Sequence, residues 1–168
     1  MLPCWNWYGI MTVYAIWEEE SASRKEATCL TLRESLPMEE SRARMLNPLQ
    51  LAYIGDGVWE LLVRSRIIYK GRSARHVHKD AVACVNAHAQ SEALCRIEPL
   101  LTDDEKDIAR RGRNAHAHHA APKNQDAADY RAATALEALI GYLYLTGQED
   151  RLLALFKHSQ EVENHAQE

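Results

Sequence analysis

An aspartate stands between two glycines in YIGDGVWELL, residues 53–62, inside an otherwise apolar stretch that reads as a helix. Glycine inside a helix costs about 1 kcal/mol relative to alanine, and a charge that faces a core costs more unless it is paired. Glu60 and Arg64 follow Asp56 at i+4 and i+8, so the three side chains share one helix face. This face is either a solvated row of salt bridges, worth little in stability, or part of a site that uses the Asp56 carboxylate.

Glu137 is the second acid that interrupts an apolar pattern. It is the only charged residue in AATALEALIGYLYL, residues 132–145, and like Asp56 it has small residues close by. For either acid alone, a solvent-exposed position would be the simpler explanation. Two such acids are harder to explain in this way, because both helices are too apolar to have a broad solvent-exposed face. Two carboxylates facing each other in a partly buried cleft would repel, and Mg²⁺ relieves that repulsion while keeping positions for water and phosphate oxygens. We therefore predict that Asp56 and Glu137 bind Mg²⁺, which activates water for phosphodiester hydrolysis.

A basic cluster, RRGRN at residues 110–114, and the later PKN fit a phosphate-bearing substrate. Arginine binds phosphate in bidentate geometry, and glycine lets a backbone approach closely. Complementing a helix macrodipole explains one arginine comfortably and three less well. No aromatic residue interleaves the cluster, so double-stranded RNA, which is recognised by shape, is favoured over a stacked single strand. The predicted RNA-binding residues are Arg110, Arg111, Arg113, Asn114, Lys123 and Asn124.

The histidines of HAHH, residues 116–119, form a weaker metal motif. They have no cysteine nearby and no fixed helical spacing, which zinc sites usually show. A zinc phosphoesterase is therefore a distant alternative. A polar or RNA-facing loop is the favoured interpretation of His116, His118 and His119.

Helices must position these residues, because no segment alternates with period two and β-branched residues are few. Apolar residues run nearly all round from Leu49 to Tyr69, which predicts a central, buried helix that Asn47 and Pro48 start and Gly71 ends. LTDDE matches a capping box, with a helix from about Asp103. The fold class is all-α. The other predicted helices run from Ser73 to Ile97, from Asp103 to Asn114, from Tyr130 to Leu145 and from Glu149 to about Lys157.

Composition is that of a soluble globular protein, with 46% apolar and 26% charged residues among 168 and a net charge of -4. No apolar run approaches the roughly 18 residues that span a bilayer, and the N-terminus lacks the features of a secretory signal. The cysteines, at 4, 29, 84 and 95, are scattered and form no C-x-x-C pair, as is typical of reduced thiols. These features predict a cytoplasmic protein without a membrane partner.

The chain is expected to divide into an atypical leader (residues 1–44), a catalytic domain (45–157) and a polar tail (158–168). The leader has no sustained 3.6-residue period. Met38 and Met45 both lie just before the first clean helical pattern. The leader is therefore either an extension upstream of an internal natural start or an arm that binds a partner.

Five segments in this order resemble the Mini-ribonuclease III family, which has a ribonuclease III catalytic domain without a double-stranded-RNA-binding domain. They are LAYIGDGVWELLVR, HKDAVACVNAHAQ, LTDDEKDIARRGRNA, PKN and YRAATALEALIGYLYL, and the resemblance covers about residues 46–156. It implies an all-helical homodimer that cleaves double-stranded RNA with Mg²⁺ and matures the large-subunit ribosomal RNA precursor. By motif, Asp56 corresponds to a metal-associated catalytic aspartate and Glu137 to a metal-binding glutamate. The RGRN and PKN segments should touch RNA.

The chain departs from full-length ribonuclease III at positions where that enzyme carries further carboxylates, which here are Leu49, Ala52 and Thr134. The reduced set is similar to the Mini family and implies a single Mg²⁺, or a second one held mostly by substrate. Gly57 stands where alanine is common in the family, and His116 where lysine is common. The alternative function is a non-catalytic helical module that binds RNA or assists ribosome assembly on the same fold.

Overall fold

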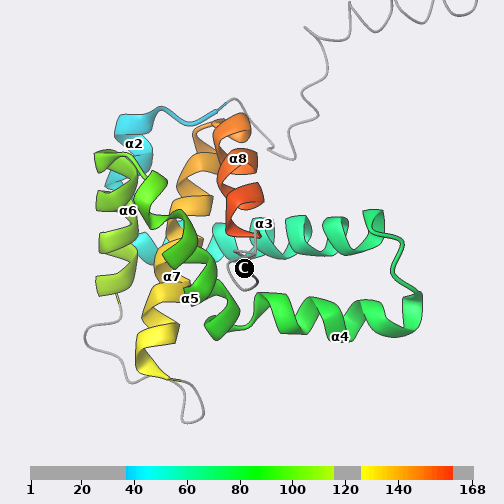
Figure 1. The fold of residues 1–168 in the computed structure, drawn as a ribbon. Coiled ribbons are helices and arrows are strands. Elements are labelled where there is room, and N and C mark those ends of the chain that lie inside the picture. Colours follow the sequence, from blue (N-terminus) through cyan, green and yellow to red (C-terminus); the bar gives the residue numbers. More distant parts are fainter. Residues whose placement is uncertain (1–36, 116–125, 161–168) are drawn as a thin grey trace, which may run out of the picture. The chain divides into compact units, whose positions relative to one another are not determined.

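The computed structural model describes residues 37–115 and 126–160. These ranges are helical and contain no strand, so the predicted all-α class is confirmed (Figure 1). Of the predicted site residues, Lys123 and Asn124 lie outside the described residues, as do His116, His118 and His119. The elements are α2 (Glu40–Met45), α3 (Pro48–Tyr69), α4 (Ala74–Val85), α5 (Ala87–Ile97), the 3₁₀ turn η1 (Glu98–Leu100), α6 (Asp103–Asn114), α7 (Ala127–Leu145) and α8 (Glu149–Ser159).

The starts of α3 and α6 follow the capping chemistry that the sequence indicates. Asn47 caps α3 by accepting from the Leu49 N–H, and the Gln50 side chain accepts from the Asn47 N–H. Thr102 and Glu105 form the expected reciprocal pair at the start of α6. Each capping box satisfies backbone donors that have no partner within the helix, and so fixes where the helix begins.

The single helix predicted from Ser73 to Ile97 is wrong, because the chain breaks at Asn86 into α4 and α5. Asn86 has extended backbone angles, and its side-chain oxygen accepts from the Ala89 N–H as an N-cap. Its Nδ2 donates to the carbonyls of Val82 and Ala83 at the end of α4. One asparagine therefore ends one helix and starts the next, as its short polar side chain allows.

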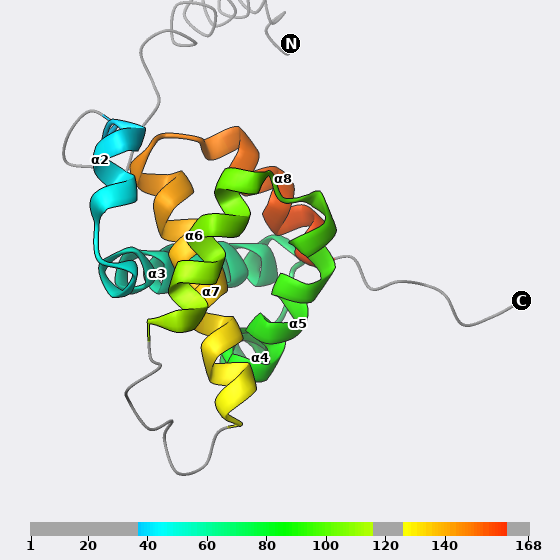
Figure 2. The same ribbon diagram turned by 90° about the vertical axis from the view of Figure 1, so that its left-hand side faces the viewer.

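Helix α7 is the centre of the fold and packs against α3, α5, α6 and α8 (Figures 1 and 2). It begins at Ala127, three residues before the predicted start, because Asp126 caps it by accepting from the Ala128 N–H. From Ala133 to Leu143, every residue except Glu137 is buried. A helix that is apolar all round is buried all round, and Glu137 is the exception that needs a reason.

Helix α3 is less buried than its composition suggests. Its buried residues recur about once per turn on the side that faces α7, while Tyr53, Leu61 and Ile68 are 83%, 47% and 59% exposed. The expectation that α3 is buried on all sides is therefore wrong for the single chain. Its outer face carries these exposed apolar side chains together with exposed charged ones, among them Asp56 and Arg64.

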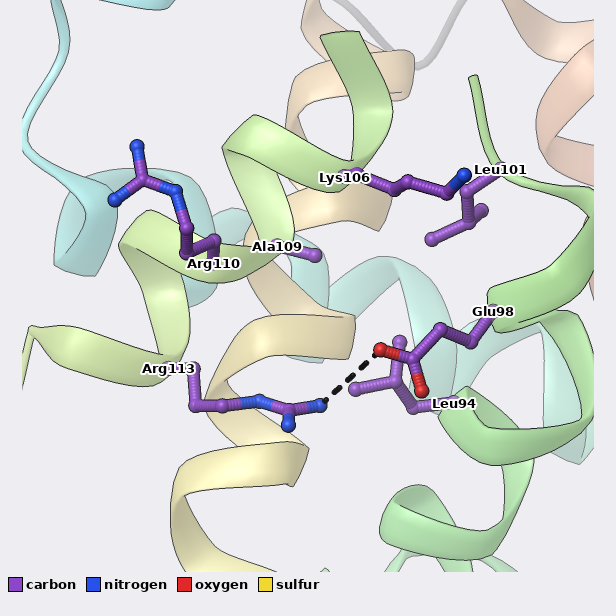
Figure 3. A pocket seen from close by; sticks show the side chains of 7 residues that line it. All are labelled: Leu94, Glu98, Leu101, Lys106, Ala109, Arg110 and Arg113. Carbon is purple, nitrogen blue, oxygen red and sulfur yellow. Dashed lines mark ion pairs between the residues drawn. The ribbon is translucent and has the colours of Figure 1, made fainter. Parts of the chain in front are cut away.

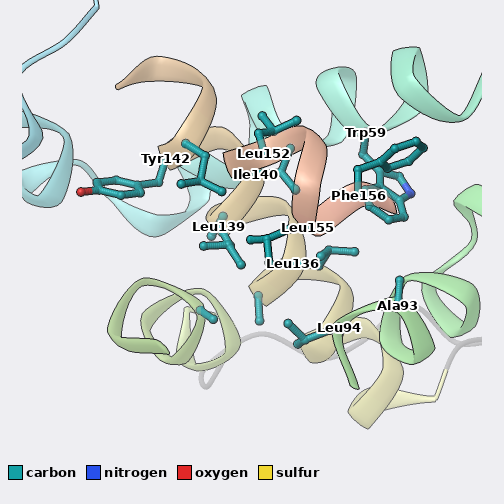
Figure 4. Packing of buried hydrophobic residues seen from close by; sticks show 14 of the residues in the cluster. Trp59, Ala93, Leu94, Leu136, Leu139, Ile140, Tyr142, Leu152, Leu155 and Phe156 are labelled. Atoms are coloured by element: carbon teal, nitrogen blue, oxygen red, sulfur yellow. The ribbon is translucent and has the colours of Figure 1, made fainter. Parts of the chain in front are cut away.

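Large side chains from three helices close the core beside this crossing (Figure 4). Trp59 of α3 meets Phe156 of α8 edge to face, with ring centroids 5.3 Å apart. Leu136, Leu139 and Leu155 are fully buried between α7 and α8. Aromatic pairs of this geometry add about 0.5–1.5 kcal/mol to the gain from burial, so α3 is held at a fixed orientation to its neighbours.

The last residues of the predicted leader are part of the packed unit, which begins at Pro37. Ala43 of α2 is fully buried, and the Met38 N–H donates to the Leu145 carbonyl over 2.8 Å. Arg44 forms an ion pair with Asp104 of α6. The domain boundary near residue 45 stays a prediction. None of the helices in the described ranges is both long and apolar enough to cross a membrane.

Candidate active site

The backbones of α3 and α7 touch where two glycines face each other. A Cβ added to Gly55 would lie 1.8 Å from the carbonyl oxygen of Glu137, and one added to Gly141 would lie 2.0 Å from the carbonyl oxygen of Leu51. No side chain larger than hydrogen fits at either position. Because Asp56 directly follows Gly55, the crossing brings its carboxylate to the helix turn that carries Glu137. Gly55 and Gly141 are therefore the residues that allow this approach.

Gly57 has no such packing role. A Cβ added there would meet no atom within 4 Å among the described residues, and the residue is exposed. The two glycines that flank Asp56 therefore differ: Gly55 permits the helix contact, and Gly57 borders open space beside the carboxylate.

The environment of Glu137 opposes its negative charge. Burial and the nearby Asp56 charge raise the pKa of Glu137 from its ordinary 4.5 to about 7, against a smaller lowering by the Gln90 amide. Burial and the Glu60 charge raise the pKa of Asp56 as well. Both carboxyl groups therefore lie where burial and a neighbouring negative charge disfavour ionisation. A bound cation would favour the ionised form of each acid and so lower both pKa values.

Glu60 is on the same face of α3 as Asp56 but is engaged elsewhere. Its carboxylate accepts from Arg64 at 2.6 Å, and both side chains are substantially exposed. The salt-bridge row that the sequence allowed is therefore present at Glu60 and Arg64. Asp56 has no ion pair among the described residues, and its charge raises the pKa of Glu137.

The protein offers a small set of ligands around this crossing. Within the described ranges, no three residues among histidine, cysteine, aspartate and glutamate are grouped closely enough to hold a metal together. Ala52 and Thr134 are buried, and the Thr134 hydroxyl donates to the Tyr130 carbonyl of its own helix. Two carboxylates with open positions around them fit Mg²⁺, which binds few protein ligands and keeps several waters.

Gln90 of α5 is a polar residue at this site that sequence reasoning missed. It is only 2% exposed, and its Nε2 has no hydrogen-bond partner in the described structure. A signal was available, because Leu94 and Ile97 follow at i+4 and i+7 and form the buried face of the same helix. An amide on that face requires a partner or a function.

The arginines of RGRN point in different directions. Arg110 and Arg113 line a cavity of about 270 Å³ between α6 and the segment from α5 to Leu101 (Figure 3). Arg113 reaches across to Glu98, 3.9 Å away, whereas Arg110 points away from that pair and binds Asp107. Both guanidinium groups are well exposed, and both remain predicted RNA ligands, as does the exposed Asn114 at the end of α6.

Arg111 faces the opposite way and fastens α6 to α2. Its Nη1 donates to the Arg44 carbonyl over 2.7 Å, and its Nη2 donates to the Leu46 carbonyl over 2.9 Å. The proposed reason for Gly112 is wrong: it is buried, and a Cβ there would lie 2.8 Å from the Cβ of Ala138 in α7. This glycine serves the packing of α6 on α7 and does not expose backbone to RNA. RNA binding by Arg111 stays a prediction.

The sequence and the fold of the chain are similar to those of known proteins. Residues 49–148 match the family model described as Ribonuclease III domain. Proteins called Mini-ribonuclease 3 are similar to the chain: that of Symbiobacterium thermophilum is 48% identical over 64% of this chain and 82% of its own length. That of Gloeobacter violaceus is 44% identical over 76% and 93%. A crystal structure of a Fusobacterium nucleatum protein, 31% identical, covers 71% of this chain and 96% of its own, with a TM-score of 0.63.

Proposed function

Since this chain belongs to the ribonuclease III family, among its Mini-ribonuclease 3 members, and is an endoribonuclease of that type, we propose that it hydrolyses double-stranded RNA with the help of Mg²⁺. The observation that carries this proposal is the crossing of α3 and α7, which brings Asp56 and Glu137 together in an environment that disfavours both charges. We further propose that its substrate is the precursor of large-subunit ribosomal RNA, in the cytoplasm.

Asp56 and Glu137 would hold the cation from two helices whose separation is fixed by Gly55 and Gly141. If bound there, Mg²⁺ would supply positive charge for a scissile phosphate and would lower the pKa of a coordinated water. Glu137 must release its proton to act as a ligand, and because its pKa is raised to about 7, cation binding is expected to be favoured as pH rises above neutrality. The open space next to Gly57 leaves Asp56 accessible to a substrate phosphate.

Exposed cations at the end of α6 supply the contacts with the RNA backbone. Arg110 and Arg113 are exposed there, and Asn114 ends the helix. Lys123 and Asn124 follow later in the sequence and are also proposed to bind RNA. These side chains recognise phosphate and ribose rather than base edges, as double-stranded RNA requires.

The uncovered face of α3 supports a homodimer. Tyr53, Leu61 and Ile68 fall within one arc of this helix, and a second copy related by two-fold symmetry would cover the same arc on both chains. Asp56 lies on the same helix as this surface. A dimer would thus bring two sites close together, one for each strand of a duplex.

A cleavage assay on a long RNA duplex tests the function. We expect Mg²⁺-dependent cutting that stops in EDTA, and we expect Asp56→Asn and Glu137→Gln to lower the rate at least a thousandfold, about 4 kcal/mol in activation free energy, while RNA binding persists. Asp150→Asn, at an exposed position in α8, is the matched control. Binding without any cutting by the unchanged protein would instead support the non-catalytic RNA-binding module.

A further inference from the structure

We propose that Gln90 is a positioning residue that orients the Glu137 carboxylate toward the divalent cation by donating a hydrogen bond from Nε2 to one carboxylate oxygen. This inference rests on the proposed function and adds a third residue to its site. It gives α5 a role in the chemistry, since Asp56 and Glu137 belong to α3 and α7.

The position of Gln90 supports this role. The side chain is 2% exposed on the face of α5 that packs against α7, between the apolar residues of the core. The amide is near enough to Glu137 to lower the pKa of its carboxyl. Its Nε2 nevertheless reaches no acceptor in the described structure with hydrogen-bond geometry. The donor is therefore buried, adjacent to the carboxyl, and available.

A buried amide without a partner costs about 1–3 kcal/mol, so it is expensive to keep for packing alone. A leucine or methionine would fill the same volume without that cost. The cost is recovered if the amide meets an ionised carboxylate, because hydrogen bonds to charged acceptors are the strong ones. Glu137 becomes fully ionised when a cation binds, and a donor on the side away from the cation would then fix which oxygen faces it. Partners of this kind commonly change metal affinity by 10–100-fold.

The test compares the metal affinity with the stability of Gln90→Met, which keeps the length of the side chain and removes the amide. Mn²⁺ serves as the probe, with free Mn²⁺ followed by electron paramagnetic resonance, and thermal unfolding is measured in EDTA. We expect Mn²⁺ affinity to fall by 10–100-fold while the unfolding temperature is unchanged or higher. Gln160→Met, the same substitution at the end of α8, is the control and should change neither quantity.

The outcomes separate this inference from the function on which it rests. Normal Mn²⁺ affinity in Gln90→Met, with tight binding by the unchanged protein and weak binding by Asp56→Asn, would overturn the role of Gln90 and leave the site intact. Lower stability with unchanged affinity would make Gln90 a packing residue. Tighter binding by Gln90→Glu would make position 90 a direct oxygen ligand and overturn the positioning role. No binding by the unchanged protein would overturn the proposed site together with this inference.

Discussion

At the scale of single residues, the protonation of Glu137 links the site to the stability of the whole chain. Its pKa is about 7 in the folded state, against an ordinary value of 4.5, because burial and Asp56 disfavour the anion. Between these two values, the folded state holds a proton that the unfolded state has released. Folding is therefore stabilised below the lower value by the neutral form, and this stability is lost as pH rises toward 7.

We therefore predict that the metal-free protein loses about 1–3 kcal/mol of unfolding free energy between pH 5 and pH 8 through this group, and that Glu137→Gln removes this loss. Denaturant titrations in EDTA at both pH values measure it. Excess Mg²⁺ should restore the stability of the unchanged protein at pH 8 and leave that of Glu137→Gln unaffected. The same dependence on pH in both proteins would contradict the assignment of the shifted group.

Two arginines of one motif should respond differently to the same substitution. Arg113→Ala should weaken RNA binding and flatten its dependence on salt, because an exposed phosphate contact is lost. Arg111→Ala should lower the unfolding free energy by about 1–3 kcal/mol, because two carbonyls near α2 lose their donor. Filter binding at several salt concentrations and denaturant unfolding measure the two effects. Equal stability of both variants would remove the structural role of Arg111.

At the scale of elements, the crossing of α3 and α7 depends on Gly55 and Gly141, which have no Cβ. Gly55→Ala should destabilise the fold by about 1–3 kcal/mol or more and lower cleavage, since a Cβ cannot fit beside the Glu137 carbonyl. Gly57→Ala is the matched control on the same helix. It should raise stability by about 0.5–1 kcal/mol, because its Cβ meets nothing and alanine favours the helix. A stable, active Gly55→Ala protein would show that the helices can separate without loss of the site.

The sequence predicted elements best where a local signal decides them. The cap predicted at Asn47 and the capping box predicted at Thr102 correctly marked the starts of α3 and α6. The helix break at Asn86 was missed because an asparagine within an apolar pattern can either cap a helix or continue one, and the sequence alone does not distinguish the two. The role of Gly112 was misread, and the bonds from Arg111 to the Arg44 and Leu46 carbonyls were missed, because the segments that these residues contact are distant in sequence. The pairing of Asp56 with Glu137 was predicted because each is an acid that interrupts an apolar helix. Gln90 was missed because it is uncharged and does not stand out in the same way.

At the scale of the whole molecule, α3 exposes Tyr53, Leu61 and Ile68 on the face proposed for a dimer. We predict that Leu61→Glu converts a dimer to a monomer, because the proposed symmetric interface would bury the added charge on both chains. Sedimentation equilibrium measures the mass. Leu153→Glu, at a similarly exposed leucine of α8, is the control and should remain dimeric. A monomeric unchanged protein would rule out the interface and with it the paired cutting of two strands.

The packing of α2 also bears on where translation of an active protein can begin. A chain initiated at Met38 would retain the bond from that residue to Leu145, the Arg44 pair with Asp104, and both carbonyls that Arg111 binds. A chain initiated at Met45 would lose the first three of these four contacts. Of these two methionines, which are seven residues apart, only Met38 precedes the whole of α2.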